Sequence, residues 1–251
     1  MTSPNVGTQD TSLNAVAVVS ATDIWAVGIY TDETLSLQYT LTEHWNGKQW
    51  SVVASPSPGV YDNELSGVTA FSSKNIWAVG YTSPVGPEET LIEHWDGTVW
   101  SIVSSPSPGN GLNQLFGVAK IPGTNHVWAV GSFNNTNSGT LSLLERWNGT
   151  KWSVIPNPDP GSSNTALYGV VALAKNDAWA VGYTANANNK SKTLTEHWDG
   201  TQWSVVPSPS ITSENNLLVS VASVAGTTQL WTAGGSFSGT GTGETLTELY
   251  C

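Results

Sequence analysis

The feature that most constrains this chain is the spacing of its tryptophans. All thirteen fall into three columns of a unit that recurs about every 51 residues. The first column lies in the phrases IWAVG, IWAVG, VWAVG, AWAVG and LWTAG and comprises Trp25, Trp77, Trp128, Trp179 and Trp231. The second comprises Trp45, Trp95, Trp147 and Trp198, with Tyr250 in the fifth copy. The third comprises Trp50, Trp100, Trp152 and Trp203. A repeat of this length is typical of a solenoid, a propeller or another array of stacked units.

Charge and composition exclude several classes of partner. The chain has 19 acidic and 8 basic residues, a net charge of −11, and its basic residues are scattered. Nucleic-acid binding needs clustered Lys and Arg, so we expect no nucleic-acid partner. No apolar run approaches the roughly twenty residues of a membrane span. The single cysteine, Cys251, cannot form an internal disulfide, so we expect packing alone to hold the fold.

The composition also bears on location. The first residues, MTSPNVGTQD, do not resemble a signal peptide, and they begin in mid-repeat, so we expect an upstream segment to have been removed. Many Ser, Thr, Asn and Gly with few Lys favour an extracellular or cell-surface protein, which we expect to be bacterial.

The second copy shows the unit most clearly. Asp96-Gly97 is a hairpin signal, and the prolines of SPSPG at 55–59 and 105–109 end an outer strand and lead to the next unit. No segment has helical spacing over ten residues. The copy contains four short runs rich in Val, Ile, Trp and Thr, which favour strands: residues 65–71, 76–81, 90–95 and 100–103.

The pattern within these runs indicates how the sheets pack. In the second run Trp77 and Val79 alternate with Ile76 and Ala78, so both faces are apolar and need a sheet against each. A small residue recurs in the first run, as expected where the innermost strands of a ring crowd together: Ala15, Gly67, Gly117, Gly169 and Ser220.

These features predict an all-β, five-bladed β-propeller with four-stranded blades, the fifth of which lacks its outer strand. We expect a single domain over residues 1–251. The predicted blades are at about 10–58, 62–108, 112–160, 164–209 and 215–251.

The order L-x-G-V, then WAVG, then EHWDG-x-x-W resembles kelch-like and Asp-box-like propeller repeats. It is also similar to the repeats of photosystem assembly-factor propellers, which pair a WAVG strand with a DG-x-x-W turn. Five blades at this length resemble the tachylectin type of sugar-binding propeller. The resemblance covers the whole chain and implies a propeller fold and a carbohydrate ligand. It carries over no ligand-site motif, and Ala21-Thr22-Asp23-Ile24-Trp25 only partly matches an Asp-box.

The unfinished fifth copy predicts an exposed strand edge at residues 246–250. Such an edge invites pairing with another chain. We therefore expect a homo-oligomer formed through this edge or through Cys251, or else a chain cut from a longer array. A monomer that tolerates a three-stranded blade is the alternative.

Two recurring polar columns are interpreted without a catalytic or metal role, the glutamates as structural and the histidines as structural or solvent-facing. A glutamate in every copy shares a strand face with Leu and Trp, so it is expected to lie in a seam between sheets, bonded to backbone or indole N–H groups. The histidines of the same strand are separated by whole copies and cannot meet at one metal. The two columns are Glu43, Glu93, Glu145, Glu196 and Glu248, and His44, His94 and His197.

The candidate ligand-binding residues are aromatic. An indole face suits the apolar side of a sugar ring, and the third tryptophan column lies on the outermost strand, where partial exposure is plausible. The connections that follow the second and fourth strands diverge among the copies and are predicted to share one face, where a partner docks. The candidates are Trp50, Trp100, Trp152, Trp203, Tyr61, Phe116 and Tyr168.

A ring of oxygen-bearing side chains precedes the first strands: Asp10, Asp62, Asn164 and Asn215. Hard oxygen ligands suit Ca²⁺ or Mg²⁺, so these residues are a candidate metal site at one mouth of the ring. The favoured alternative is that each opens its strand through an Asx turn. No other cofactor is expected.

We therefore expect a protein that is not an enzyme and that binds carbohydrate or another extracellular ligand on the variable-loop face. A protein–protein scaffold that self-associates through the fifth copy is the alternative. A glycosidase would need unrepeated carboxylates that converge, and Asp10 with Asp62 is the one pair the sequence places together.

Overall fold

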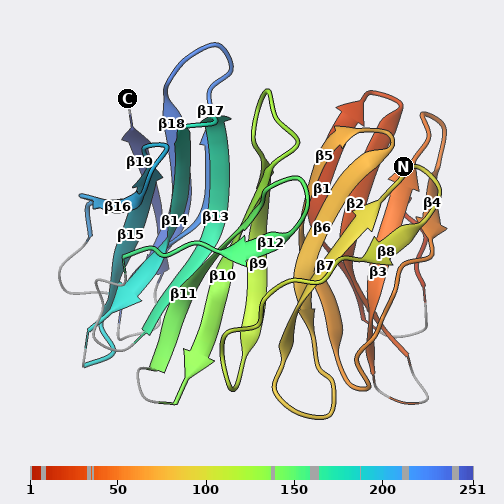
Figure 1. Cartoon of the computed structure of the whole chain (residues 1–251), viewed down its shortest axis with the longest axis horizontal. Helices are drawn as coiled ribbons and strands as arrows, with labels where there is room; N and C mark the ends of the chain where they lie inside the picture. The colour runs from red at the N-terminus through yellow and green to blue at the C-terminus, as the bar shows by residue number, and fades with distance from the viewer. Residues whose placement is uncertain are drawn as a thin grey trace. The chain divides into compact units, whose positions relative to one another are not determined.

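The computed structural model describes residues 2–6, 10–32, 35, 37–136, 139–158, 164–186, 188–210, 215–238 and 243–250. These residues form nineteen β-strands and no helix (Figure 1). The all-β prediction is confirmed. No helix long and apolar enough to cross a membrane occurs in this part of the chain.

The chain forms two compact units. The first comprises Met1–Pro108 with Leu112–Val118, and the second comprises Gly109–Gly111 with Ala119–Cys251. The first contains β1 (Thr11–Ser20), β2 (Asp23–Thr31), β3 (Gln38–Trp45), β4 (Trp50–Val53), β5 (Asn63–Ser72), β6 (Asn75–Thr82), β7 (Glu89–Trp95) and β8 (Trp100–Ile102).

Strand β9 (Asn113–Lys120) runs across the boundary between the units. The second unit continues with β10 (Val127–Asn135), β11 (Gly139–Trp147), β12 (Trp152–Val154), β13 (Asn164–Ala174), β14 (Asp177–Ala185), β15 (Ser191–Trp198), β16 (Trp203–Val206), β17 (Asn215–Ser223), β18 (Leu230–Phe237) and β19 (Gly243–Tyr250).

Two of the sheets are four-stranded meanders, β1-β2-β3-β4 and β5-β6-β7-β8. An eight-stranded sheet has the order β16-β15-β14-β13-β11-β10-β9 with β12 beside β11, and its two halves meet in a single parallel pair, Thr140 with Asn164. The last sheet, β17-β18-β19, is three-stranded. The four runs predicted in the second copy match β5 to β8 to within two residues at each end.

Glycine is required where the first two strands of a repeat meet. The register of β5 against β6 shifts between Leu65 and Gly67, and this bulge brings the Glu64 carbonyl toward Gly80. A Cβ on Gly80 would lie 1.8 Å from that oxygen, which no side chain tolerates. The WAVG phrase therefore ends in glycine because the backbone of the bulge occupies the space of a side chain.

The small-residue column also has a physical reason. A Cβ on Gly67 would lie 3.0 Å from the Phe116 carbonyl oxygen, and one on Gly169 would lie 3.1 Å from the Ser220 Cα. In both units the first strand of one repeat closely approaches the first strand of the next.

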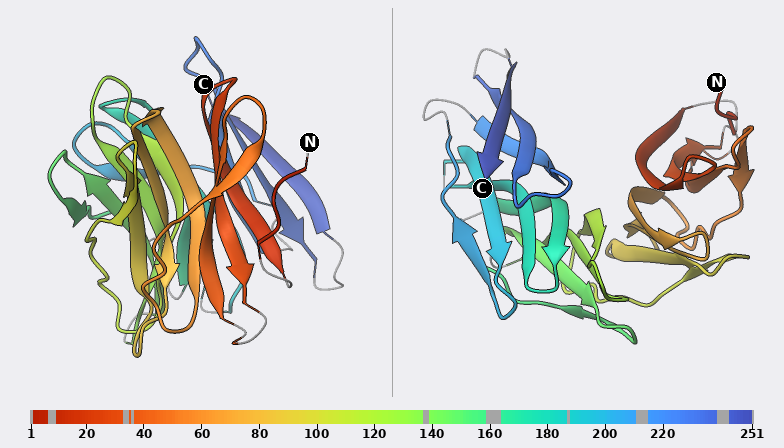
Figure 2. Two further views of the ribbon diagram at one scale, coloured as in Figure 1. Left: turned by 90° about the vertical axis from the view of Figure 1, so that its right-hand side faces the viewer. Right: turned by 90° about the horizontal axis from the view of Figure 1, so that it is seen from above.

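The core lies in the seams between successive sheets. In the first unit β1 packs against β5, so that sheets β1–β4 and β5–β8 lie face to face (Figure 2). The buried residues of this seam include Trp25, Val27, Leu65, Ile76 and Trp100. The second unit has an equivalent cluster: Trp128, Val130, Leu144, Leu167, Ala180, Leu194, Trp198 and Trp203 are among its members.

Candidate functional site

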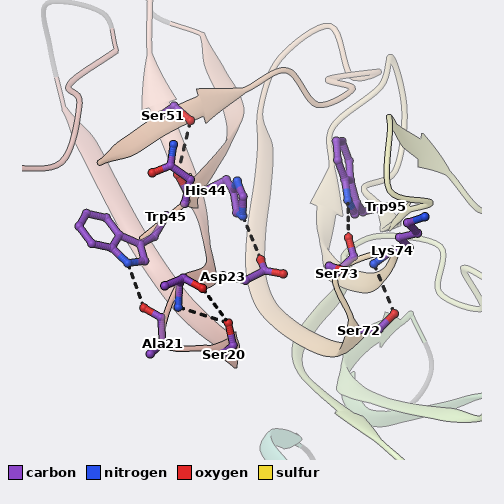
Figure 3. Close-up of polar contacts among 12 residues, drawn as sticks. Ser20, Ala21, Asp23, His44, Trp45, Ser51, Ser72, Ser73, Lys74 and Trp95 are labelled. Atoms are coloured by element: carbon purple, nitrogen blue, oxygen red, sulfur yellow. Dashed lines mark hydrogen bonds and ion pairs between the residues drawn. The ribbon is translucent and has the colours of Figure 1, made fainter. Parts of the chain in front are cut away.

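One end of each repeat is uniform. At this end the indole Nε1 of Trp45 donates to the Ala21 carbonyl (3.2 Å), and that of Trp95 donates to the Ser73 carbonyl (3.2 Å) (Figure 3). The same figure shows the hydrogen bond between His44 Nε2 and Asp23 Oδ1, which is 2.9 Å long. His197 Nε2 forms the equivalent hydrogen bond with Asp177 Oδ1 at 3.0 Å. These contacts recur from repeat to repeat, so the histidines and second-column tryptophans hold the scaffold, as predicted for the histidines.

The other end, which we call the loop end, carries the connections after the second and fourth strands. In the first unit the Tyr61 N–H donates to the Ser83 carbonyl (3.1 Å), and the Ser83 N–H donates to the Asp62 carbonyl (2.7 Å). Residues 61 and 62 precede β5, whereas Ser83 follows β6, so these hydrogen bonds place both connections at one end. Here the repeats differ from one another.

At the loop end of the first unit, polar side chains from strands β1, β5, β6 and β9 and from the loops before β5 and β7 lie close together. Glu64 on β5 accepts hydrogen bonds from the Tyr81 hydroxyl (3.2 Å), the Asn14 amide (3.1 Å) and the Ser66 hydroxyl (3.2 Å). Glu88, just before β7, accepts one from the Gln114 amide at 2.7 Å. We call Asp62, Glu64, Tyr81, Glu88 and Gln114 the carboxylate cluster.

The repeats do not require this cluster for folding. The position of Glu64 is occupied by Ser12, Ala166 and Leu217 in other repeats, and each pairs with the second strand in the same register. Glu64 and Glu88 were not predicted as site residues, because they lie in different segments that come together only after folding. An alignment of the repeats could have identified them, since both are charged residues at positions where the other repeats are mostly uncharged.

The surroundings of the cluster raise the pKa of two of its groups, Glu88 and Tyr81. Burial raises the pKa of Glu88, the Gln114 hydrogen bond opposes this, and the charges of Asp62 and Glu64 add to the rise. Burial also raises the pKa of Tyr81, and the charge and hydrogen bond of Glu64 raise it further. Tyr81 is therefore a neutral hydroxyl donor at pH 7. Perturbed groups of like charge, held together in one place, are typical of functional sites.

A pocket of about 370 Å³, within the size range of small-ligand sites, lies in the first unit, and none of the five cluster residues lines it. Glu89, which follows Glu88, lines it together with the apolar side chains of Pro58, Pro84 and Leu91. Its hydroxyls are partly engaged in the scaffold, because Thr90 Oγ1 lies 2.7 Å from Ser105 Oγ. The remaining lining residues are Thr82, Ile102, Val103, Ser104, Ser105 and Ser107.

The predicted aromatic residues near the loops differ in exposure. Tyr61 is 54% exposed and lies at the loop end of the first unit. Phe116 is half-buried on β9 in the same unit. Tyr168, in the second unit, is half-buried and stacks on Tyr183 with ring centroids 6.1 Å apart. Tyr61 therefore has the most open ring of the three.

The third-column tryptophans are mostly covered. Trp100, Trp152 and Trp203 are only 2 to 4% exposed, whereas Trp50 is half-buried. Their indoles are occupied by the seams: Trp100 lies edge-on to Trp25 at 5.5 Å, and Trp203 lies edge-on to Trp128 at 5.1 Å. Position on the outermost strand does not expose them, because a neighbouring sheet covers that face, and a sugar would have to displace this packing to reach them.

The repeated glutamates are buried, as predicted, but their donors differ from those expected. Glu43 accepts from the Ser3 hydroxyl, Glu196 accepts from the Asn157 amide (3.2 Å to each oxygen), and Glu248 accepts from the Ser208 hydroxyl. Glu93 is fully buried, and neither of its oxygens has a hydrogen-bond partner among the described residues. Burial raises the pKa of Glu93 to about 8.

Two of the four candidate metal ligands act in the scaffold. Asn215 Oδ1 accepts from the Ser191 N–H (3.1 Å), and Asn164 Oδ1 accepts from the Thr140 N–H (3.4 Å). Asp10 and Asp62 accept hydrogen bonds through their backbone carbonyls. In the described part of the chain, no three His, Cys, Asp or Glu side chains are grouped so as to hold a metal ion. A Ca²⁺ or Mg²⁺ site at these residues stays a prediction.

The edge of the last sheet is formed by β19, which has no further strand beside it among the described residues. Pairing of another chain along this edge stays a prediction. Cys251, the predicted site of a crosslink, lies outside the described residues.

Comparison with solved structures identifies the class of fold. The chain is similar to a Trypanosoma rangeli sialidase in complex with sialic acid, with a TM-score of 0.58, 12% identity, and coverage of 94% of this chain and 43% of that one. It is similar to YCF48 bound to D1 peptide, with a TM-score of 0.50, 13% identity, and coverage of 91% and 63%. It is also similar to a polysaccharide lyase, an ulvan lyase bound to a saccharide, with a TM-score of 0.51, 10% identity, and coverage of 85% and 59%.

These structures are β-propeller proteins, and the chain shares their fold. It spans less than two thirds of the length of each. No protein-family model matches the sequence, and no curated protein matches it.

The comparisons correct one expectation. The sequence predicts a protein that is not an enzyme, but a sialidase and a lyase have this fold. That prediction was wrong; it rested on finding no converging, unrepeated carboxylates other than Asp10 with Asp62. A fold does not decide function, which depends on the groups placed on it.

Proposed function

We propose that the chain is a carbohydrate-binding β-propeller module that takes a neutral saccharide at the loop end of its first unit. Its five repeats act as blades, four of them four-stranded and the fifth without an outer strand. The observation that carries the proposal is the carboxylate cluster at the loop end of the first unit.

The chemistry of the cluster suits sugar hydroxyls. Ionised carboxylates accept hydrogen bonds only, and the hydroxyls of a saccharide donate them. The second amide hydrogen of Gln114 can donate to a hydroxyl oxygen, and the Tyr81 hydroxyl, whose hydrogen goes to Glu64, can accept from a sugar hydroxyl. The exposed ring of Tyr61 offers an apolar face to a pyranose. Asp62, Glu64 and Glu88 repel acidic sugars, so a neutral saccharide fits better than a sialic or uronic acid.

The fold similarity supports the class of ligand. The sialidase is in complex with sialic acid and the lyase is bound to a saccharide, so β-propellers of this kind present saccharide sites. The composition suits an extracellular or cell-surface location, where such ligands occur. A Ca²⁺ or Mg²⁺ site at Asp10, Asp62, Asn164 and Asn215 is tested in the same experiment, by running the glycan array with and without the metal.

The test is a glycan array followed by calorimetry on the full chain. We expect binding to neutral glycans, and a loss of affinity of about 5- to 30-fold in Glu64→Gln, Tyr61→Ala and Glu88→Gln, because each removes one contact of about 1–2 kcal/mol. Gln49→Ala, at the uniform end, is the control and should bind as the parent does. No binding to any glycan, or equal binding by all variants, would reject the proposal.

A protein–protein scaffold is the second candidate. The observation that favours it is the three-stranded sheet β17-β18-β19, whose edge strand β19 presents unpaired backbone groups among the described residues. YCF48 bound to D1 peptide shows that a protein of this fold takes a polypeptide ligand. A silent glycan array together with capture of β-strand peptides along residues 246–250 would favour this candidate.

A further inference from the structure

The pocket of about 370 Å³ in the first unit has a chemistry of its own, distinct from that of the carboxylate cluster. All of its lining residues lie between Pro58 and Ser107, within the first unit. They come from the connection before β5, from the adjoining ends of β6 and β7, and from β8 with the connection that follows it. The pocket is therefore defined by contacts inside a single unit.

Hydrogen bonds fix both walls of the pocket. Asn63 is fully buried, and its Oδ1 accepts from the Gly59 N–H (2.7 Å) and from the Thr82 hydroxyl (2.8 Å). These bonds tie the chain that follows Pro58 to the end of β6. At the opposite wall the Thr90 N–H donates to Ser107 Oγ (3.1 Å). Since the walls are already ordered, a ligand does not lose affinity by having to order them.

The hydroxyl of Thr90 determines the direction of the hydrogen bonds around it. It donates its one hydrogen to the Pro106 carbonyl (2.9 Å), because a carbonyl oxygen can only accept. Ser105 Oγ and Ser107 Oγ lie 2.7 Å and 3.2 Å from Thr90 Oγ1. All three contacts can form together only if both serines donate to Thr90. The two serines therefore have only lone pairs left for a ligand.

The other polar side chains of the lining also offer acceptors. Thr82 donates its hydrogen to the amide oxygen of Asn63, and an ionised Glu89 carboxylate has no hydrogen to donate. The Ser104 hydroxyl can rotate to accept. A ligand that matches this lining is rich in donors at one end and apolar along its length, because the rest of the lining is aliphatic: Pro58, Pro84, Leu91, Ile102 and Val103.

The first unit supplies no cation of its own to this pocket. Its sequence contains two Lys and no Arg, and both lysines, Lys48 and Lys74, lie in turns at the uniform end, between β3 and β4 and between β5 and β6. Glu88 precedes Glu89, so two carboxylates attract cations to this part of the unit.

The scaffold of the pocket recurs in other repeats, but its charge does not. Thr40 and Thr193 donate to the Pro56 and Pro209 carbonyls, as Thr90 does to Pro106. Glu89 is therefore not required for the fold of a repeat. In the three other repeats that have a fourth strand among the described residues, its position is occupied by Tyr39, Leu141 and Lys192.

We infer that this pocket binds a primary alkylammonium group, as carried by a lysine side chain or by a small free amine. An ammonium has three N–H donors and no acceptor, which matches a lining whose polar side chains accept. It lies against Glu89 and the Ser105 and Ser107 oxygens, and its methylene stem packs on Leu91 and Ile102.

Titration of the ¹⁵N-labelled full chain with n-pentylamine at pH 7, followed by NMR, tests the inference. We expect saturable shifts of the Thr90, Leu91 and Val103 amide signals. Pentanol lacks the charge, and pentyltrimethylammonium keeps the charge but has no N–H donor. Each should bind about threefold or more weakly than pentylamine, as expected for a partly screened ion pair. Nα-acetyl-lysine methylamide distinguishes the two sources, since tighter binding than pentylamine assigns the group to lysine and weaker binding assigns it to a free amine.

Two substitutions at Glu89 test its role. Glu89→Lys should abolish binding, and the fold accepts lysine here because Lys192 occupies this position in the fourth repeat. Glu89→Gln should weaken binding by about threefold or more, because Glu89 is exposed and water screens its charge. Asp96→Asn is the matched control, since it removes the same charge from a turn that has asparagine at Asn46 and Asn148 in other repeats. It should bind pentylamine as the parent does.

Four outcomes overturn the inference. They are the absence of saturable shifts, equal binding of pentanol, unchanged binding by Glu89→Lys, and an equal loss in Asp96→Asn and Glu89→Gln. The inference does not depend on the carbohydrate site, because Glu64→Gln should weaken glycan binding and leave the pentylamine shifts at Thr90 and Val103 in place.

Discussion

Trp128 and Trp231 occupy the same position of the repeat in the same unit, yet their surroundings are opposite. Trp128 is fully buried against Trp198 and Trp203, and the Arg146 guanidinium lies 5.2 Å from its ring. Trp231 is half exposed beside Leu249. The repeat dictates the residue, but the neighbouring sheet decides its burial. Each seam therefore has its own energetic weight, and the same substitution should have different effects in different copies.

The largest difference is expected at these two tryptophans. Trp128→Ala should lower the free energy of unfolding by about 3–5 kcal/mol, because it empties a filled seam. Trp231→Ala should lower it by less than about 1 kcal/mol, as for an exposed site. Urea unfolding of both variants at low protein concentration measures the contrast, and equal losses would show that the two positions are equally buried in solution.

The seam glutamates provide the second contrast. Glu93 is buried without a hydrogen-bond partner among the described residues, and burial raises its pKa to about 8. The pKa of Glu93 in the folded state is above the ordinary value of 4.5. The free energy of unfolding is therefore highest below about pH 4.5, where Glu93 is protonated, and it falls as pH rises to about 8.

Glu93→Gln should therefore remove part of the loss of stability at alkaline pH. The gain is expected to be on the order of a few kcal/mol at pH 8, given about 1.4 kcal/mol for each pKa unit. Unfolding free energies measured from pH 5 to pH 9 test this. Ile92→Val, beside it on β7, should lower stability by about 1 kcal/mol at every pH and serves as the control. An unchanged slope in Glu93→Gln would contradict the assignment.

At Glu196, the glutamate of the second unit that has a hydrogen-bond donor, loss of that donor should destabilise the protein, whereas Glu93→Gln should stabilise it. Asn157 donates to both oxygens of Glu196, which is fully buried, and to the Ser142 hydroxyl at 2.8 Å. Asn157→Ala should destabilise the protein by about 2 kcal/mol, because it removes hydrogen bonds to a buried charged group. Asn157→Ser should recover part of the loss, since Ser208 bonds Glu248 in this way. A neutral result for Asn157→Ala would show that other groups satisfy Glu196.

Much of the fold follows from the sequence. The tryptophan columns and the Asp-Gly and Ser-Pro signals predict β5 to β8 to within two residues at each end, because short strands bounded by turns depend on local residues. The small column at Gly67 and Gly169 reflects the close approach of successive first strands. The five-bladed arrangement stays a prediction, because it depends on how the sheets assemble, which local pattern does not report.

The candidate site was only partly predictable. Exposure of Tyr61 follows from its place in a divergent loop. The environment of Trp100 does not follow from its place on the outermost strand, because its burial depends on Trp25 of the preceding repeat. Glu64 and Glu88 are 24 residues apart and meet at one end of a sheet only through the β5–β6 pairing and the loop before β7. Contacts of this kind need three-dimensional structure.

The smallest contrast lies on the first strands of two repeats. Val16 and Val68 hold the same register position, opposite Ala26 and Ala78, but Val16 is 61% exposed and Val68 is 9% exposed. A Val-to-Thr change keeps the shape and adds a hydroxyl, which costs free energy only where the hydroxyl is buried without a partner. Val68→Thr should therefore lose about 1–2 kcal/mol of unfolding free energy, and Val16→Thr should change it by less than about 0.5 kcal/mol. Equal costs at the two valines, measured by urea unfolding, would contradict the difference in burial between the two first strands.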